Sequence, residues 1–248
     1  MVVHFVTSDW ELEKRLIGFR LIDCSHSGVN IAERISLVLA DYELTSKVLS
    51  ITLDNASANA SAMDELTPSL SSYVGSSLLH QRCACHIINL IVKSGLKRLD
   101  TYLEDFRTAI SFLNSSNQRI ASFKSYCLVV GVRPRKFGLD MNIRWNSTYL
   151  MLKHLVPYKD TFSVFIHTNY KGGSGTLLTQ DHWYVAEHIL KFLEQFYKFT
   201  VSLSGIYYPT APLMMHAIIA IANHLNQYEN DNLLRDVIVP MKSKFLKY

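Results

Sequence analysis

Asp54 is the first residue in the chain whose position suggests chemistry. It ends an apolar stretch in SITLDNASANASAMDEL (50–66), with Asn55 beside it and Asn59 about one helical turn further on. A carboxylate at the end of a strand can hold a divalent cation at the open edge of an α/β sheet. It can equally form a turn or cap the helix that follows, which is the commoner role of an isolated Asp in this position. The residues alone leave both interpretations open.

A second group of reactive residues lies in HQRCACHIINL (80–90). Cys83 and His86 have C-x-x-H spacing, and His80 and Cys85 are close by, so a zinc site is conceivable. Structural zinc sites usually gather their ligands from two separated pairs, and four ligands within the seven residues 80–86 would strain the backbone. Buried thiols beside a polar histidine are therefore the default expectation.

The third group lies in DMNIRWNSTYLML (140–152), where Arg144 is followed directly by Trp145. An arginine can pair with a phosphate, and a tryptophan can stack on an unpaired base. The alternative is a core tryptophan, with the arginine stem passing it and Asn-Ser-Thr capping the helix TYLMLKHL. The residues favour this second interpretation. The nearby basic cluster RPRK (133–136) is more typical of a solvated loop than of a nucleic-acid contact.

Two kinds of sequence pattern divide the chain. The first part predicts an antiparallel hairpin from VVHFV (2–6) and RLIGFRLI (15–22), then a helix over 28–44 capped by Asn30, then a buried strand over 47–53. Beyond residue 88 helical spacing dominates, with apolar faces formed by Leu103, Phe106, Ile110 and Leu113, by Ile189, Phe192, Phe196 and Phe199, and by Leu213, Ala217, Ile218 and Ile221. We therefore predict two domains, 1–87 and 88–248.

Composition excludes several classes of protein. The 248 residues are 48% hydrophobic and 19% charged, as in an ordinary globular protein, and a net charge of +4 is compatible with nucleic acid without indicating it. The N-terminus turns polar too soon for a secretory signal, and no apolar stretch is long enough to span a membrane. Four cysteines are too few for a disulfide scaffold, which favours a reducing compartment, the cytoplasm or the nucleus.

Four stretches, in this order, resemble the hAT-superfamily transposases. They are TLDNASANASAMDEL, QRCACHIINLIVKSGL, LDMNIRWNSTYLMLKHL and FLEQFYKFTVSLSGIYYPTAPL. The closest resemblance is to the domesticated plant relatives of the DAYSLEEPER and RICESLEEPER type, which are zinc finger BED proteins. It covers essentially the whole chain. The resemblance implies an α/β fold: a partial RNase H-like fold with a mixed sheet, interrupted by a large all-α insertion.

The resemblance also assigns roles to the three groups of residues. Asp54 matches the second of three acids that bind Mg²⁺ in intact family members. His86 of the Cys83–His86 motif, together with Arg144 and Trp145, matches positions associated with the DNA ends near the active site. Trp145 would be the residue that stacks on a flipped base.

The other two acids of the family pattern have no match in this sequence. The first is expected upstream of VVHFV and the third beyond the insertion, in the part that also dimerises family members. We therefore expect a fragment lacking both ends, with a vestigial metal site, no cofactor of its own and no catalysis. The hypothesis is a nuclear protein that binds DNA weakly and contacts no membrane. The alternatives are a protein-interaction module without DNA binding and, less favoured, a subunit of an active transposase.

Overall fold

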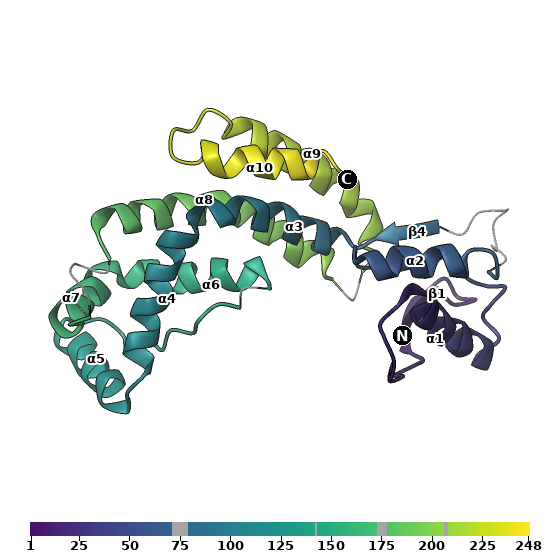
Figure 1. The fold of residues 1–248 in the computed structure, drawn as a ribbon, viewed down its shortest axis with the longest axis horizontal. Coiled ribbons are helices and arrows are strands. Elements are labelled where there is room, and N and C mark those ends of the chain that lie inside the picture. The colour runs from purple at the N-terminus through teal and green to yellow at the C-terminus, as the bar shows by residue number, and fades with distance from the viewer. Residues whose placement is uncertain (71–78, 142, 173–177, 206–207) are drawn as a thin grey trace. The chain divides into compact units, whose positions relative to one another are not determined.

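The computed structural model describes residues 1–70, 79–141, 143–172, 178–205 and 208–248. It is a mixed α/β structure, as expected, in which two compact units can be separated (Figure 1). The first unit consists mainly of Met1–Ile87, and the second of Ile88–Gly205 and Pro209–Tyr248.

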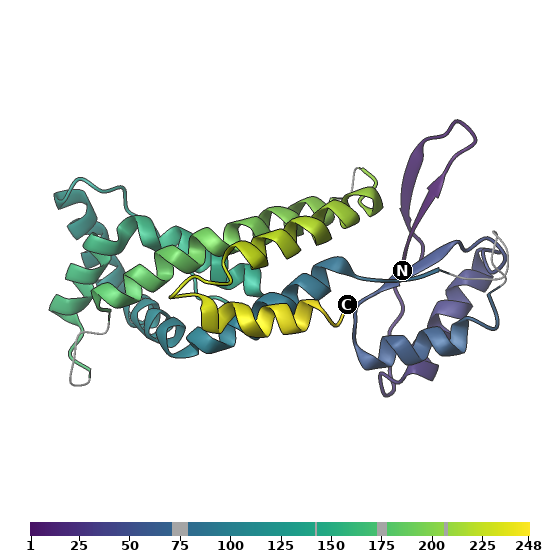
Figure 2. The same ribbon diagram turned by 90° about the horizontal axis from the view of Figure 1, so that it is seen from above.

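The first unit opens with an antiparallel hairpin of β1 (Val2–Val6) and β2 (Leu12–Leu16), whose strands lie side by side in Figure 2. The turn between them is helped by Trp10, whose φ of 63° lies in the left-handed region. The prediction of a second strand over 15–22 was wrong in its bounds. Alternating apolar residues continue past Leu16, but the regular strand pairing ends with the pair Val2–Leu16. Beyond it, the N–H groups of Ile17 and Gly18 both donate to the single carbonyl of Met1.

Two helices form the core of the first unit. Helix α1 (Gly28–Asp41) packs against α2 (Ser57–Leu66) so closely that a Cβ on Gly28 would lie 2.4 Å from the Ser61 Cβ. The prediction that Asn30 caps α1 was wrong. The cap is Ser27, whose Oγ accepts a hydrogen bond from the Asn30 N–H at 3.3 Å, because the helix begins two residues before Asn30. A cluster of buried apolar residues lies between the two helices: Ala32, Leu39, Ala62, Met63, Leu66 and Leu70.

A short parallel pair of strands completes the first unit. Strand β3 (Ser50–Leu53) pairs with β4 (Leu79–Arg82), and Leu53 lies opposite Arg82. The sequence predicted the first of these strands but not the second. The prediction of a buried strand over 47–53 was wrong in its start and its burial: β3 begins at Ser50 and its residues alternate between exposed and half-buried, because among the described residues it pairs with β4 alone. Instead of one mixed sheet, the described residues form two separate two-stranded sheets, β1–β2 and β3–β4.

The second unit contains helices and no strand among its described residues. Its elements are most of α3 (Ala84–Leu96), η1 (Lys97–Leu99), α4 (Asp100–Asn114), α5 (Asn117–Val129), α6 (Trp145–Leu155), η2 (Val156–Tyr158), α7 (Lys159–Asn169), α8 (Gln180–Leu203), α9 (Ala211–Gln227) and α10 (Arg235–Phe245). Helix α8 contacts both α6 and α9, and it runs beside α9 in Figure 2.

The core of the second unit confirms most of the predicted helix faces. All four apolar residues predicted on α4, and all four on α8, are buried. Helix α9 differs from its predicted face, because it packs through Ala217, Ile221 and Leu225, while Leu213 and Ile218 lie on its exposed flank.

Among the described residues, no helix combines the length and the apolar composition needed to cross a membrane.

Candidate functional site

Asp54 follows directly on the last residue of β3, and its side chain is exposed. One carboxylate oxygen, Oδ1, accepts hydrogen bonds from the Ala56 N–H at 2.9 Å and from the Asn59 side-chain amide at 2.8 Å. These contacts form a turn that leads the chain into α2. Asp54 therefore has the turn-forming role that the sequence allowed, and its carboxylate remains exposed to solvent.

Cys83 lies at the neighbouring strand end. Its N–H donates to the Leu53 carbonyl at 2.9 Å, so Cys83 and Asp54 both follow the carboxyl ends of paired parallel strands. That edge of a parallel sheet is where functional residues of α/β proteins commonly gather. His86, one turn further along α3, is half-buried.

The environment of Cys83 favours its thiolate. Its pKa is lowered to about 6, mainly by a hydrogen bond from the Cys85 thiol, against the opposing effect of burial. The backbone N–H groups of His86 and Cys85 at the start of α3 and the charge of His86 lower it further. Cys83 is therefore the thiol of this strand edge most ready to react at neutral pH.

The described residues do not assemble a complete metal site. No three His, Cys, Asp or Glu side chains among them gather where one ion could bind. Asp54 is a single carboxylate with one oxygen already engaged, whereas a two-metal centre needs several acids. The residues present thus do not fit the Mg²⁺ centre that the resemblance implies, and no step through a metal follows from them.

Arg144 and Trp145 lie in the second unit, at the start of α6. The Trp145 N–H donates to Asn89 Oδ1 of α3 at 3.2 Å, and the Trp145 side chain is only 2% exposed. Its ring meets Tyr149 edge-on, with 6.2 Å between ring centroids. Arg144 is exposed and forms no ion pair with another described residue. The proposed roles in DNA binding stay predictions.

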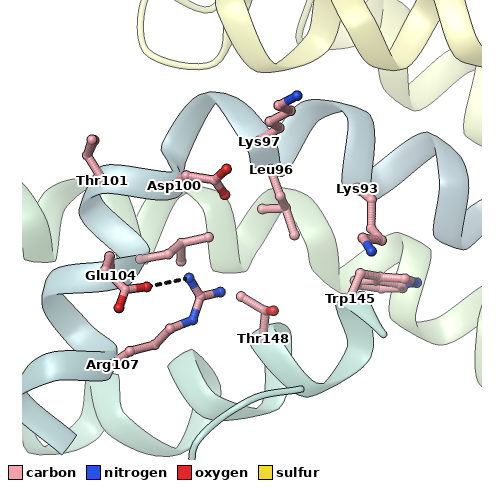
Figure 3. Close-up of a pocket in the computed structure, with 10 residues that line it drawn as sticks. Lys93, Leu96, Lys97, Asp100, Thr101, Glu104, Arg107, Trp145 and Thr148 are labelled. Carbon is pink, nitrogen blue, oxygen red and sulfur yellow. Dashed lines mark hydrogen bonds and ion pairs between the residues drawn. The ribbon is translucent and has the colours of Figure 1, made fainter. Parts of the chain in front are cut away.

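Trp145 forms part of the wall of a hollow of about 560 Å³ within the second unit (Figure 3). Helix α3 and the η1 turn contribute Lys93 and Lys97, which are both exposed. Lys93 points toward Trp145, whereas the Lys97 side chain points away from it (Figure 3). Neither lysine is ion-paired among the described residues. The remaining lining residues are Leu96, Asp100, Thr101, Leu103, Glu104, Arg107 and Thr148.

Sequence reasoning missed Asn89, Lys93 and Lys97. Their spacing of four residues, on a stretch with helical periodicity, places them on one face and could have drawn attention to them. It also missed the ion pair of Arg107 with Asp140, because a separation of 33 positions leaves no local signal.

Comparisons with known proteins match two family models to successive parts of the chain. A family model described as "ZBED1 RNase-like domain" matches residues 1–79, and one described as "ZBED1 RNase-like helical domain" matches residues 81–192. The protein named "Putative AC transposase" of Zea mays is 28% identical over 100% of this chain and 32% of its own length. Zinc finger BED domain-containing protein RICESLEEPER 2 of Oryza sativa subsp. japonica is 26% identical, over 99% of this chain and 35% of its own.

A more distant plant relative is zinc finger BED domain-containing protein DAYSLEEPER of Arabidopsis thaliana. It is 20% identical over 100% of this chain and 36% of its own length. The chain thus spans about a third of the length of the curated relatives it matches.

Proposed function

Because the chain belongs to the family of hAT transposases and their zinc finger BED relatives, we propose that it is the DNA-binding middle of a transposase-derived nuclear protein. In this proposal the first unit is part of an RNase H-like fold, and the second is a helical insertion into that fold. The names of the two matching family models support this assignment. Asp54 then corresponds to the second acid of the family's metal site.

The observation that carries DNA binding is a group of exposed cations in the second unit: Lys93 and Lys97 line the hollow, and Arg144 directly precedes Trp145 of its wall. Asn89 holds the backbone of Trp145, which places Arg144 beside α3, and Lys93 lies one turn further along that helix. Arg144, Lys93 and Lys97 are exposed, and none of them forms an ion pair with another described residue, although Asp100 and Glu104 line the same hollow. Exposed cations that form no ion pair suit a phosphate backbone.

Salt dependence of DNA binding tests this proposal. If these three cations each replace one counterion, affinity should fall about 40-fold between 50 and 200 mM salt. Replacing Arg144, Lys93 or Lys97 by Ala should lower the slope by about one unit each. Lys198→Ala, at a lysine already paired with Glu194 on α8, is the control and should leave the slope unchanged. Affinity that is constant over a tenfold range of salt would refute electrostatic binding.

The stacking role of Trp145 needs a separate test, because the ring is buried where it lies. It could stack on an unpaired base only after turning out of its site. Trp145→Phe keeps an aromatic ring in the core and reduces the stacking surface. We expect it to weaken binding to hairpin ends with unpaired bases more than binding to plain duplex. Equal losses on the two substrates would assign Trp145 to the core alone.

We propose that this stretch does not catalyse strand transfer by itself. Asp54 is its one match to the three family acids, and one carboxylate leaves no second metal position. An active transposase would need the other acids from elsewhere, including another chain. A Mg²⁺-dependent DNA cleavage assay with an Asp54→Ala control decides this. Cleavage that disappears in the variant would overturn the proposal.

One observation favours a protein-interaction module as the second candidate. Helix α9 exposes a run of large apolar side chains, with Met215 at 65%, Ile219 at 54% and Ile218 at 42% exposure. Runs of this kind commonly mark contacts with other proteins. If the chain retains protein partners but no DNA at low salt, and Met215→Glu with Ile219→Glu releases those partners, this candidate replaces the first.

A further inference from the structure

The most deeply buried charged side chain of the described ion pairs is Asp140, four residues before Arg144. Its side chain is 1% exposed. Arg107 of α4 donates to it through two nitrogens, from Nε to Oδ1 at 2.7 Å and from Nη2 to Oδ2 at 2.8 Å. Thr148 donates from Oγ1 to Oδ2 at 2.5 Å. A two-pronged arginine–carboxylate pair fixes orientation as well as distance.

These contacts join three parts of the second unit. Arg107 belongs to α4, Thr148 to the first turn of α6, and Asp140 to the irregular segment that leads into α6. The same first turn is held from another side by Asn89, which accepts from the Trp145 N–H. Arg144 and Trp145 therefore lie between two separate attachments.

Electrostatics show that the Asp140 carboxylate is held in its charged form. Burial alone would raise its pKa, but hydrogen bonds from Arg107 and Thr148 and the charge of Arg107 outweigh burial and hold it below the ordinary value. Arg107 in turn has a raised pKa, chiefly through its hydrogen bond to Asp140. A buried ion pair contributes little net stability compared with apolar packing, yet it specifies one arrangement of the groups it joins.

We propose that Asp140 is a positioning residue, which fixes the Arg144–Trp145 turn for nucleic acid through Arg107 and Thr148. The proposal rests on the proposed function, because it names the residue that orients the same site. Arg107 and Thr148 also line the hollow whose wall contains Trp145, so the network and the binding surface share one wall. Rigid support of this kind is what a binding group needs to meet its ligand without an ordering cost.

The first test follows Trp145 itself, in the whole chain labelled with 5-fluorotryptophan. The ¹⁹F signal of Trp145 is assigned with Trp145→Phe, and it is measured well below the melting temperature. Asp140→Asn keeps the shape of the side chain but removes its charge, and Thr148→Val removes one hydrogen bond without leaving a charge unpaired. Both should shift or broaden the Trp145 signal. Glu187→Gln, which makes the same change in the exposed pair with Lys159, should not.

The second test asks whether Asp140 acts through Arg144. Asp140→Asn should weaken DNA binding about tenfold in the wild-type background, since misplaced binding groups lose much of their contribution. In an Arg144→Ala background it should have little further effect, because the group it positions is gone. Losses that simply add would overturn the proposal, and so would folded Asp140→Asn with unchanged DNA affinity and an unchanged Trp145 signal.

Failure of the two proposals can be told apart. If the wild-type chain binds no DNA at low salt, the proposed function is wrong, and the ¹⁹F signal alone decides whether Asp140 fixes the turn. If the chain binds DNA and Trp145 does not respond to either substitution, the positioning role is wrong while DNA binding stands.

Discussion

The sequence predicted that Asp54 of the first unit belongs to a functional site, and the structure led us to propose that Asp140 of the second supports one, but the surroundings of the two acids are opposite. Asp54 is exposed and uses one oxygen for a local turn. Asp140 is buried and uses both oxygens for partners from two other elements. An exposed carboxylate can still accept a new ligand, whereas a fully engaged one can only hold geometry.

The cores of the two units also differ, in the size of the side chains that they bury. The buried cluster of the first unit has six residues of small or medium size, and its hairpin strands are largely exposed. The second unit buries many large aromatic side chains, among them Phe106, Phe162, Phe192 and Phe196. Since stability grows with the apolar area removed from water, the second unit should be the more stable one.

The largest expected difference between the units concerns their cysteines. Cys83 has a pKa of about 6, whereas burial raises the pKa of Cys127 in the second unit above its ordinary value. Because the thiolate is the reacting form, iodoacetamide at pH 7 should modify Cys83 more than about 100-fold faster than Cys127. The rate at Cys83 should rise with pH and level off above a midpoint near 6, which mass spectrometry of the labelled peptides can follow.

The exposed Cys24 provides the internal reference for the alkylation rates. A midpoint for Cys83 equal to that of Cys24 would show that the start of α3 and the Cys85 thiol do not stabilise its thiolate. Equal rates at Cys83 and Cys127 in the folded chain would remove the contrast between the units altogether.

The two cores can be compared directly through one fully buried leucine in each, Leu66 in the first unit and Leu193 in the second. Replacing either by Ala should destabilise its unit by about 2–5 kcal/mol. For the first unit this is a larger share of its stability, so Leu66→Ala should unfold it while the second unit stays folded. Hydrogen exchange detected by mass spectrometry separates the two sets of amides. Loss of protection throughout the chain in Leu66→Ala would show one cooperative structure instead of two.

Sequence patterns predicted those parts of the fold that depend on local periodicity. The end of β3 before Asp54 and the buried faces of α4 and α8 follow from alternation and helical spacing, and the structure confirms them. Strand β4 was missed because LHQR (79–82) contains three polar residues and is recognised only by its pairing with β3.

The site depends on contacts between distant residues, which leave no such pattern. The burial of Trp145 was one of two interpretations that the sequence allowed, because Arg-Trp suits a core as well as a binding surface. The pairing of Asp140 with Arg107 exists only because the fold brings α4 close to the segment before α6, and the sequence does not show this proximity.

Acid should weaken the second unit through Asp140. Its pKa is lower in the folded chain than in the unfolded one, so its contribution to stability is present above the unfolded value, about 4, and is lost as the pH falls through the folded value. The free energy of unfolding of this unit should therefore decrease below about pH 4, and Asp140→Asn should lack this part of the decrease. Urea unfolding followed by the fluorescence of buried Trp183 measures it. Identical acid dependence in the variant would contradict the prediction.

The smallest expected effect is at Asp54. Asp54→Ala removes the acceptor for the Ala56 N–H and the Asn59 amide, which should cost the first unit about 1 kcal/mol, as loss of a helix cap does. Asp54→Asn keeps a side-chain oxygen in the same place and should stay close to the wild type in stability. Denaturant unfolding of the first unit, read by hydrogen exchange in α2, compares the two variants. If both variants lose the same stability, the charge of Asp54 and not its turn contacts matters for folding.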